Sequence, residues 1–406
     1  MARIEQTKQP EPPKKTEATR HISERETLNL WVRSGGRCAM CNTFLLEEPV
    51  LERPINLGER AHIAGWTDTA GSPRSDSTVP LPDRNKGSNL LLLCQDCHTV
   101  IDHPDTRAEY PEERLLSIKH EHEDRIHHLT AMGLDRETAV LRLFGSIRGS
   151  VPEMARSLAI QTVVDGAGRY ARFPFAPDRH SVEIDLSRLP EPEDDDAYWR
   201  LGQAQIDKAM VRIADHVSEK QVRHLSIFAV ARIPLLMYLG FALDDKVPID
   251  LYQKHRGDKE GWIWPEDGSE PAFKIVAHRD GEPGGDVALI LSLSGTVPLT
   301  DLPPEVEGLA VFEILPADAT PNPNLFRSRA MLNAFVRTWQ DLLSQLEVTH
   351  KTTPCIHVFP AVPITAAVAF GRVVMRHVHP AIRVYDRIGG TTFCPALTMN
   401  AREAQQ

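Results

Sequence analysis

The sequence predicts a small α+β domain held by a zinc ion, followed by a larger α/β domain. Two CxxC pairs, Cys38 with Cys41 and Cys94 with Cys97, supply four thiolates at the spacing of a tetrahedral zinc site. From Leu225 onward, apolar runs of β type alternate with helical patterns, which is typical of an α/β sheet with mostly parallel strands. The 406 residues have room for both domains, each with its own core.

Changes in composition mark the expected domain boundaries. Residues 1–20 are rich in proline, lysine and glutamate, which predicts a flexible N-terminus that buries no core. We assign residues 21–130 to the first domain and residues 131–165, which are punctuated by glycines, to a helical linker. Residues 166–406 then form the second domain.

Three polar residues beside the cysteine pairs are the candidates for chemistry. A zinc ion held by four cysteines has no open coordination position, so we expect it to stabilise the fold. The polar residues occur in the order His62, Asn89 and His98. A neutral imidazole can accept a proton from water near neutral pH, and a divalent metal can neutralise charge on a phosphate.

These residues resemble the HNH endonuclease family, whose ββα-metal motif runs His, Asn, His and often lies between zinc-binding CxxC pairs. The resemblance covers about residues 28–125. It implies that His62 is the general base that takes a proton from water. It also implies that Asn89 fixes the loop between the two strands and that His98 holds a divalent metal on the scissile phosphate.

One position departs from the family pattern. Many members carry an Asp or His just before the base as a second metal ligand, and Ala61 cannot ligate. Glu59, on the same face of a strand, or Asp102, one helical turn after His98, could replace it. The resemblance implies a structural Zn²⁺ and a catalytic divalent metal, Mg²⁺ with Mn²⁺ or Ni²⁺ as alternatives. The segment 67–88 is rich in Ser, Asp, Pro and Gly, which predicts a mobile loop over the site.

In the second domain, apolar and helical patterns predict five strands and four helices. The strands are expected at 225–230, 287–293, 309–315, 355–359 and 382–385. The helices are expected at about 198–220, 234–243, 327–347 and 363–377.

The longest apolar run, from Leu225 to Leu243, reaches the length of a membrane span. Arg232 and Pro234 interrupt it, so we expect a buried strand that enters a helix and no membrane contact. The N-terminus is polar and shows no secretory leader. Cysteine pairs of the zinc type favour a reducing compartment, which predicts a cytoplasmic protein.

The order of the two domains carries a second resemblance. An HNH-like domain followed by an α/β domain, with the segments 228–234 and 357–361, resembles the HNH–SAVED effectors of CBASS anti-phage systems. This resemblance implies that the second domain consists of two fused CARF-like, Rossmann-like halves that bind a cyclic di- or trinucleotide second messenger.

The net charge fits such an effector. A formal charge of −10 is unusual for a protein that cuts nucleic acid, because neutralising phosphates takes clustered lysine and arginine. Weak affinity of a single copy for DNA would keep the protein inactive until a messenger assembles several copies, which can then cut DNA together. The expected partners are therefore a cyclic oligonucleotide, double-stranded DNA and, on activation, further copies of the chain.

Ligands of parallel sheets bind at the carboxyl ends of the strands. There, Arg232 offers a guanidinium to a phosphodiester, and aromatic rings offer faces to bases. Proline and glycine at these ends could equally mark turns, and Trp262 and Trp264 could equally brace a hairpin in the core. The predicted ligand-binding residues are Arg232, Pro234, Tyr238, Lys254, Arg256, Trp262, Trp264, Ser294, Gly295, Phe359, Pro360, Ala361 and Thr365.

Two other functions are compatible with the sequence. The chain could be a modification-dependent HNH restriction endonuclease whose C-terminal domain reads a modified base. It could also be a zinc-stabilised DNA-binding module without activity, in which His62 and His98 merely pack. Cleavage of DNA only with a cyclic nucleotide, cleavage that depends on methylated DNA, and no cleavage under any condition separate these three hypotheses.

Overall fold

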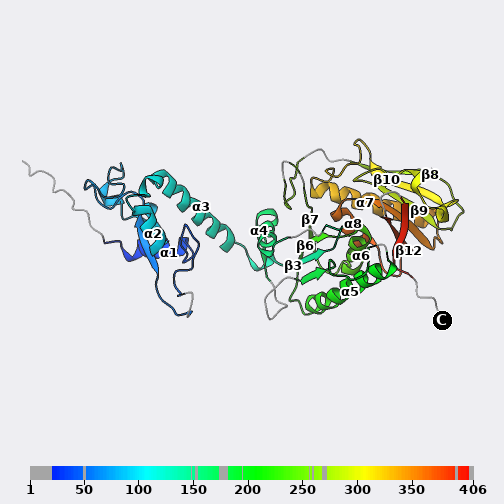
Figure 1. The fold of residues 1–406 in the computed structure, drawn as a ribbon, viewed down its shortest axis with the longest axis horizontal. Helices are drawn as coiled ribbons and strands as arrows, with labels where there is room; N and C mark the ends of the chain where they lie inside the picture. The colour runs from blue at the N-terminus through cyan, green and yellow to red at the C-terminus, as the bar shows by residue number, and fades with distance from the viewer. Residues whose placement is uncertain are drawn as a thin grey trace, which may run out of the picture. The chain divides into compact units, whose positions relative to one another are not determined.

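A computed structural model of the chain divides into two compact units, Met1–Met132 and Gly133–Gln406 (Figure 1). The N-terminal residues 1–20, for which we predicted flexibility, lie outside the part of the chain that the structure describes. The described residues are 21–48, 52–147, 149–150, 154–172, 182–193, 195–255, 257, 260–267, 272–388 and 392–401.

The first unit packs an antiparallel hairpin against helices. Its elements are α1 (Glu24–Arg33), β1 (Gly58–His62), η1 (Leu81–Asp83), η2 (Gly87–Asn89), β2 (Leu90–Cys94), α2 (Gln95–Asp102), η3 (Arg107–Glu109) and α3 (Glu112–Thr130). In the hairpin, Gly58 pairs with Cys94 and His62 pairs with Leu90. Leucines 90–93 of β2 are all buried and form the centre of the core. The hairpin followed by α2 therefore has ββα order.

The second unit begins with a sheet of parallel strands. Its elements are η4 (Leu134–Arg136), β3 (Glu137–Phe144), α4 (Arg156–Ala167), β4 (Tyr170–Ala171), β5 (Val182–Asp185), α5 (Asp196–Ser218), β6 (Leu225–Val230), α6 (Ile233–Leu243) and β7 (Ile249–Tyr252). The sheet order is β4-β3-β6-β7, and β5 also pairs with β3. β6 and α6 confirm that the long apolar run is a buried strand that enters a helix.

A second sheet follows in the same unit. Its elements are β8 (Phe273–Arg279), β9 (Val287–Ser292), η5 (Leu299–Asp301), η6 (Pro304–Val306), β10 (Ala310–Pro316), α7 (Arg329–Thr349), β11 (Cys355–Ala361), α8 (Ile364–Val373), β12 (Ala381–Ile388) and β13 (Thr392–Met399). The order is β13-β12-β11-β9-β10-β8, with parallel pairs inside and antiparallel strands β8 and β13 at the edges.

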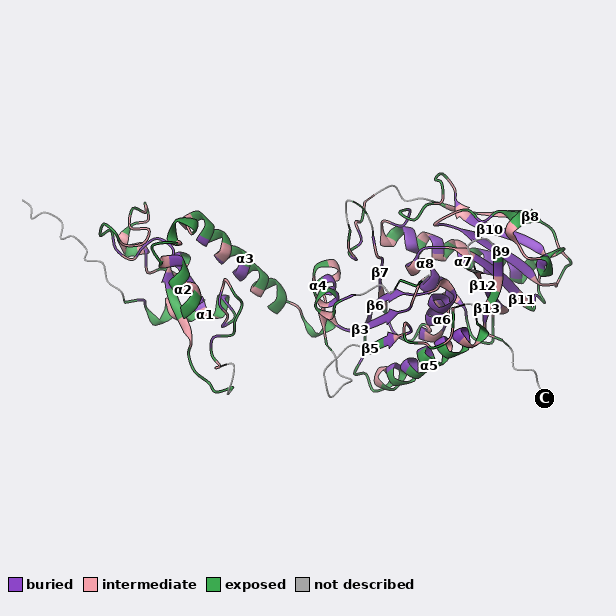
Figure 2. Cartoon of the chain, in the orientation of Figure 1, coloured by how far each residue is buried: buried purple, intermediate pink, exposed green. Residues whose placement is uncertain are grey.

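The two sheets repeat one topology. The parallel strands β5-β3-β6-β7 of the first sheet match β10-β9-β11-β12 of the second in order and in chain sequence. Helix α6 joins β6 to β7 as α8 joins β11 to β12. This repeat confirms the predicted α/β domain of two Rossmann-like halves. Figure 2 shows α6 buried along its length, because it packs against α8 from the other half.

One sequence-based expectation is wrong. We expected residues 131–165 to form a helical linker, but residues 137–144 are β3, a strand with neighbours on both sides. Seven consecutive residues of β3, 138–144, are buried. A strand that is covered on both faces is apolar without alternation, and such a run cannot be distinguished from a buried helix by periodicity.

Candidate functional site

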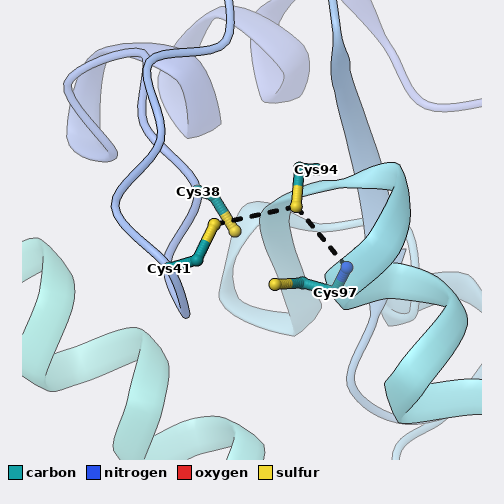
Figure 3. A group of neighbouring side chains, drawn as sticks. All are labelled: Cys38, Cys41, Cys94 and Cys97. Carbon is teal, nitrogen blue, oxygen red and sulfur yellow. Dashed lines mark hydrogen bonds between the residues drawn. The ribbon is translucent and has the colours of Figure 1, made fainter.

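The four cysteines of the two CxxC pairs come together in the first unit (Figure 3). The sulfur atoms of Cys38, Cys41, Cys94 and Cys97 all lie within 4.8 Å of one another, and those of Cys41 and Cys94 are 3.7 Å apart. Four sulfurs at zinc–thiolate bond length in a tetrahedron are separated by about 3.8 Å. The group could therefore bind a metal ion such as zinc.

Local structure explains how each pair presents its sulfurs. Cys94 is the N-cap of α2, and its sulfur accepts a hydrogen bond from the Cys97 amide at 3.5 Å. The other pair lies in a turn in which the Cys38 amide donates to Thr43 and the Ala39 amide donates to Leu92 of β2. The cluster thus joins the turn at residues 38–43 to the end of the hairpin.

Asn89 lies just before β2 and is buried. Its side-chain oxygen accepts from the Ala64 amide at 2.8 Å, and its nitrogen donates to the carbonyl oxygens of Ala64 at 3.0 Å and Arg84 at 2.9 Å. The side chain therefore closes the loop that leaves β1. His62 ends β1 and is half-buried, and its Nε2 lies 2.9 Å from Oδ1 of Asn85.

His98 lies on α2 between two carboxylates. Its Nδ1 is 2.6 Å from Oε2 of Glu59 on β1, and its Nε2 is 3.4 Å from Oδ2 of Asp102. The hydrogen bond with Asp102 raises the pKa of His98, partial burial opposes this shift, and Glu59 adds to it. Burial tends to raise the pKa of Asp102, but hydrogen bonds from His98 and Arg74 lower it below its ordinary value.

Two arginines that the sequence analysis did not select fasten the segment 67–88. The Arg84 side chain is buried and donates to the carbonyl oxygens of Val79, Gly65 and Ser77. Arg74 donates hydrogen bonds to His62 at the end of β1 and to Ile101 and Asp102 of α2. The loop is therefore more constrained than its composition predicts. An arginine inside a polar loop has no local signal that distinguishes a buried anchor from a solvated side chain.

In the second unit, the Arg232 guanidinium is paired with two carboxylates of the same chain. Its Nε donates to Asp386 at 2.7 Å, its Nη1 to Glu193, and its Nη2 to the Arg387 carbonyl oxygen at 3.3 Å. The guanidinium also lies 5.9 Å from the ring centre of Trp199. Arg232 thus joins the N-terminus of α6 to the carboxyl end of β12 in the other half.

The aromatic platform that we predicted is not supported for three of its residues. Trp262 and Trp264 are 4% and 3% exposed, and Phe359 is fully buried. Trp262 packs edge-on against Phe228, and Phe359 packs against Tyr385. The alternative that the tryptophans brace the core describes their positions, because Trp262 lies in a buried apolar cluster and the Trp264 indole donates to the Leu251 carbonyl oxygen at 2.8 Å.

The remaining predicted ligand-binding residues lie near the carboxyl ends of several strands and on α6. Thr365, at the start of α8, donates from its hydroxyl to Gln253 at 2.7 Å, beyond the end of β7. Tyr238 donates to Asp207, and Lys254 pairs with Glu260 at 3.3 Å. Pro234 is buried in the first turn of α6, Ser294, Gly295, Pro360 and Ala361 are half-buried, and Arg256 lies outside the described residues.

Two cavities of the second unit are lined by other residues than the predicted ligand-binding ones, except that Tyr238 lines one of them. One of about 660 Å³ is lined by the ends of α6 and α8 with α7, and includes Arg329 and Arg372. The other, of about 700 Å³, lies between α5 and α6 and includes Tyr238 and Asp207. Both contain residues from the C-terminal end of α6, whereas Arg232 and Thr365 lie at the N-terminal ends of their helices.

Residues 205–399 match the model of the SAVED family, described as the "SMODS-associated and fused to various effectors sensor domain". This match supports the predicted sensor domain. No curated protein sequence matches the chain. Among the described residues, no helix is both long and apolar enough to span a bilayer.

Among solved structures, the chain is similar to Cap4 receptors that contain a SAVED/CARF domain. The Acinetobacter baumannii receptor with the cyclic trinucleotide 2′3′3′-cAAA is 14% identical, with a TM-score of 0.45 over 71% of this chain and 56% of that chain. The same receptor with 3′3′3′-cAAA is 13% identical, with a TM-score of 0.44 over 71% and 60%. The Moraxella osloensis receptor is 12% identical, with a TM-score of 0.37 over 75% and 65%. The chain thus covers less than two thirds of each of these relatives.

Proposed function

We propose that this chain, which carries a SAVED sensor domain in residues 205–399, is a metal-dependent HNH endonuclease that cuts double-stranded DNA when a cyclic oligonucleotide binds the sensor. Its biological role would be anti-phage defence in the bacterial cytoplasm. The observation that supports the proposal is the ββα unit beside the four-cysteine cluster, in which His62 ends β1, Asn89 precedes β2 and His98 lies on α2.

In this proposal, His62 is the general base. An imidazole that titrates near neutral pH can take a proton from an attacking water, and such a base contributes about 10²- to 10⁴-fold to rate. Asn89 holds the position of His62, because its side chain bonds both to the Ala64 amide and to the Ala64 carbonyl oxygen, two residues after the base. The hydrogen bond from His62 to Asn85 gives the ring a second constraint.

The donors around His98 fit a divalent metal ion. Bound there, the metal would neutralise charge on the phosphate and stabilise the leaving oxygen. His98 Nε2 and Asp102 Oδ2 lie on one side of the ring, 3.4 Å apart, and would hold it. Glu59 contacts the opposite nitrogen at 2.6 Å. Because metal-binding histidines usually donate their other N–H to a carboxylate, Glu59 would orient the ring and Asp102 would be the second ligand.

The sensor would control cutting through assembly. A net charge of −10 opposes the approach of DNA, so one copy should bind DNA weakly. A messenger that joins several copies places several nuclease sites on one duplex, which raises their effective concentration. The messenger site should lie where the carboxyl ends of the two repeated sheets meet, because ligands of parallel sheets bind at strand ends.

One experiment separates the proposal from its alternatives. Methylated and unmethylated plasmid DNA are incubated with the protein and Mg²⁺, Mn²⁺ or Ni²⁺, with and without a panel of cyclic di- and trinucleotides. Cleavage that requires one cyclic nucleotide supports the proposal. Cleavage that requires methylated DNA but no messenger supports a modification-dependent restriction endonuclease instead. Binding of DNA without cleavage under every condition supports a non-catalytic zinc module.

A further inference from the structure

Arg74 contacts the strand that ends in His62 and the helix that carries His98. Its Nε donates to the Ile63 carbonyl oxygen at 2.6 Å, and its Nη2 donates to the His62 carbonyl oxygen at 3.1 Å. Its Nη1 donates to the Ile101 carbonyl oxygen at 2.9 Å. Nη2 also pairs with Oδ1 of Asp102 at 2.5 Å. The side chain is only 9% exposed, so these bonds form with little competition from water.

The backbone at Arg74 is held in a conformation that its residue type disfavours. Arg74 has φ of +48°, a region that non-glycine residues rarely adopt. Its carbonyl oxygen accepts from the Gly65 amide at 3.0 Å. A Cβ atom at Gly65 would lie 2.2 Å from the Pro73 carbonyl oxygen, so only glycine permits this approach. The loop is thus packed closely against the exit of β1, in an arrangement that directs the guanidinium between β1 and α2.

The four bonds require a guanidinium. Its donors are rigid and planar, and they can reach the carbonyl oxygens of His62, Ile63 and Ile101 and the Asp102 carboxylate at the same time. A lysine ammonium is a single point on a flexible chain, so it could keep the pair with Asp102 but not the bridge. The bond to Asp102 uses Oδ1 and leaves Oδ2 directed at His98.

We propose that Arg74 is a positioning residue that sets the distance between the general base and the metal-binding pair His98 and Asp102. This inference rests on the proposed nuclease function. Arg74 touches neither substrate nor metal in this assignment. It acts by fixing the His62 backbone on one side and the Asp102 carboxylate on the other. Partners that orient metal ligands typically change metal affinity or activity by about 10- to 100-fold when they are removed.

The test compares Arg74→Ala and Arg74→Lys with Arg107→Ala in the full-length, zinc-loaded chain. Arg107 is a matched control, because it also donates to this loop, at the Gly71 carbonyl oxygen, and among the described residues its hydrogen-bond partners include no site residue. Binding of Mn²⁺ alone is measured by electron paramagnetic resonance, and zinc content and cooperative unfolding report on folding. We expect Mn²⁺ affinity to fall about 10- to 100-fold in Arg74→Ala and Arg74→Lys, and to be unchanged in Arg107→Ala.

Cleavage adds a second measurement. With an activating messenger and saturating metal, kcat should fall about 10- to 100-fold in both Arg74 variants while KM for DNA changes little. Added guanidinium ion should restore part of the Mn²⁺ affinity and of kcat in Arg74→Ala but change nothing in Arg107→Ala. A merely structural arginine would not give this rescue.

The outcomes separate the inference from the proposed function. A folded Arg74→Lys protein with wild-type Mn²⁺ affinity and kcat overturns the inference, even if Arg74→Ala does not fold. Loss of Mn²⁺ affinity in the Arg74 variants of a protein that cuts no DNA under any condition would support the positioning role and contradict the nuclease. Cleavage by the wild type with equal cleavage by Arg74→Lys would support the nuclease and contradict the positioning role.

Discussion

Gly240 of α6 lies so close to Val368 of α8 that a Cβ atom at position 240 would be 1.9 Å from the Val368 carbonyl oxygen. The relationship is reciprocal, since a Cβ atom at Gly371 would be 1.8 Å from the Met237 carbonyl oxygen. The two helices therefore meet backbone to backbone where the halves of the sensor domain join. A movement of one half relative to the other would therefore change the contact between α6 and α8.

A methyl group at this crossing should destabilise the sensor domain. We expect Gly240→Ala to lower the free energy of unfolding by at least about 1–3 kcal/mol, because backbone atoms cannot yield as a flexible side chain does. Gly166→Ala is the matched control. Its Cβ would meet Ile263 at an ordinary 3.4 Å, so no loss is expected. Urea denaturation measures both, and equal stability of Gly240→Ala and wild type would contradict the close approach.

The cysteine cluster should stabilise the first unit through its metal. Cys94→Ser is expected to lose zinc and to destabilise that unit, because a structural metal supplies folding free energy directly. Cys394→Ser should retain zinc and stability, since Cys394 lies on β13 outside the cluster. Zinc content by atomic absorption and thermal unfolding provide the measurements. A stable, zinc-free Cys94→Ser protein would show that the thiolates do not form the site.

Removal of the general base should stop cutting without unfolding the domain. We expect His62→Ala to lower kcat by about 10²- to 10⁴-fold with zinc content and messenger binding intact. His128→Ala, which removes an exposed histidine at the end of α3, should cut at the wild-type rate. Single-turnover cleavage of plasmid DNA measures the difference, and full activity in His62→Ala would exclude His62 from the mechanism.

The two carboxylates beside His98 should differ in their effect on metal binding. Glu59→Gln should weaken Mn²⁺ binding by about 10- to 100-fold, because it alters only the partner that orients the ring. Asp102→Asn should weaken it further, since the variant loses a charged ligand. Calorimetric titration with Mn²⁺ ranks the two variants. The reverse ranking would make Glu59 the ligand and Asp102 the orienting group.

Acid should destabilise the sensor domain through His224. Burial lowers its pKa to about 4, with Asp250 opposing that shift and Arg169 adding to it, against an ordinary value of 6.5. The unfolded chain therefore binds more protons between these values, and the free energy of unfolding falls as pH falls from about 6.5 to about 4. The loss should reach about 3 kcal/mol at most.

His224→Gln tests this pH dependence, because glutamine keeps a polar group opposite Thr138, 2.8 Å from the histidine Nδ1, but does not titrate. The difference between its free energy of unfolding at pH 7 and at pH 4.5 should be smaller than in the wild type. An unchanged pH dependence would show that His224 is not the group responsible.

The elements that the sequence predicted best are those with a short-range pattern. The run Leu225 to Val230 is β6 without any difference in its bounds, and the expected helix at 198–220 is α5 at 196–218. The CxxC spacing likewise predicted which sulfurs meet, because a chelating turn needs only neighbouring residues. The sequence analysis missed β3, β4, β5, β7, β8 and β13. Burial on both faces removes the alternation in β3 and exposure removes it in β8, whereas β13 alternates but contains Pro395, which weakens a strand assignment.

The candidate sites also contain residues that a short motif indicates and contacts that only tertiary packing determines. The motif order located His62, Asn89 and His98, but no sequence pattern indicated that Arg74 bridges their elements. Arg232 was expected to be available to a phosphate, and the folded chain instead pairs it with Asp386, which lies 154 residues further along. The ion pair between Arg232 and Asp386 depends on how the carboxyl ends of strands from the two sheets meet. Local periodicity carries the information for each strand and helix, whereas the partner of a buried charge is set by how those elements pack, because only packing brings distant residues within a few ångströms.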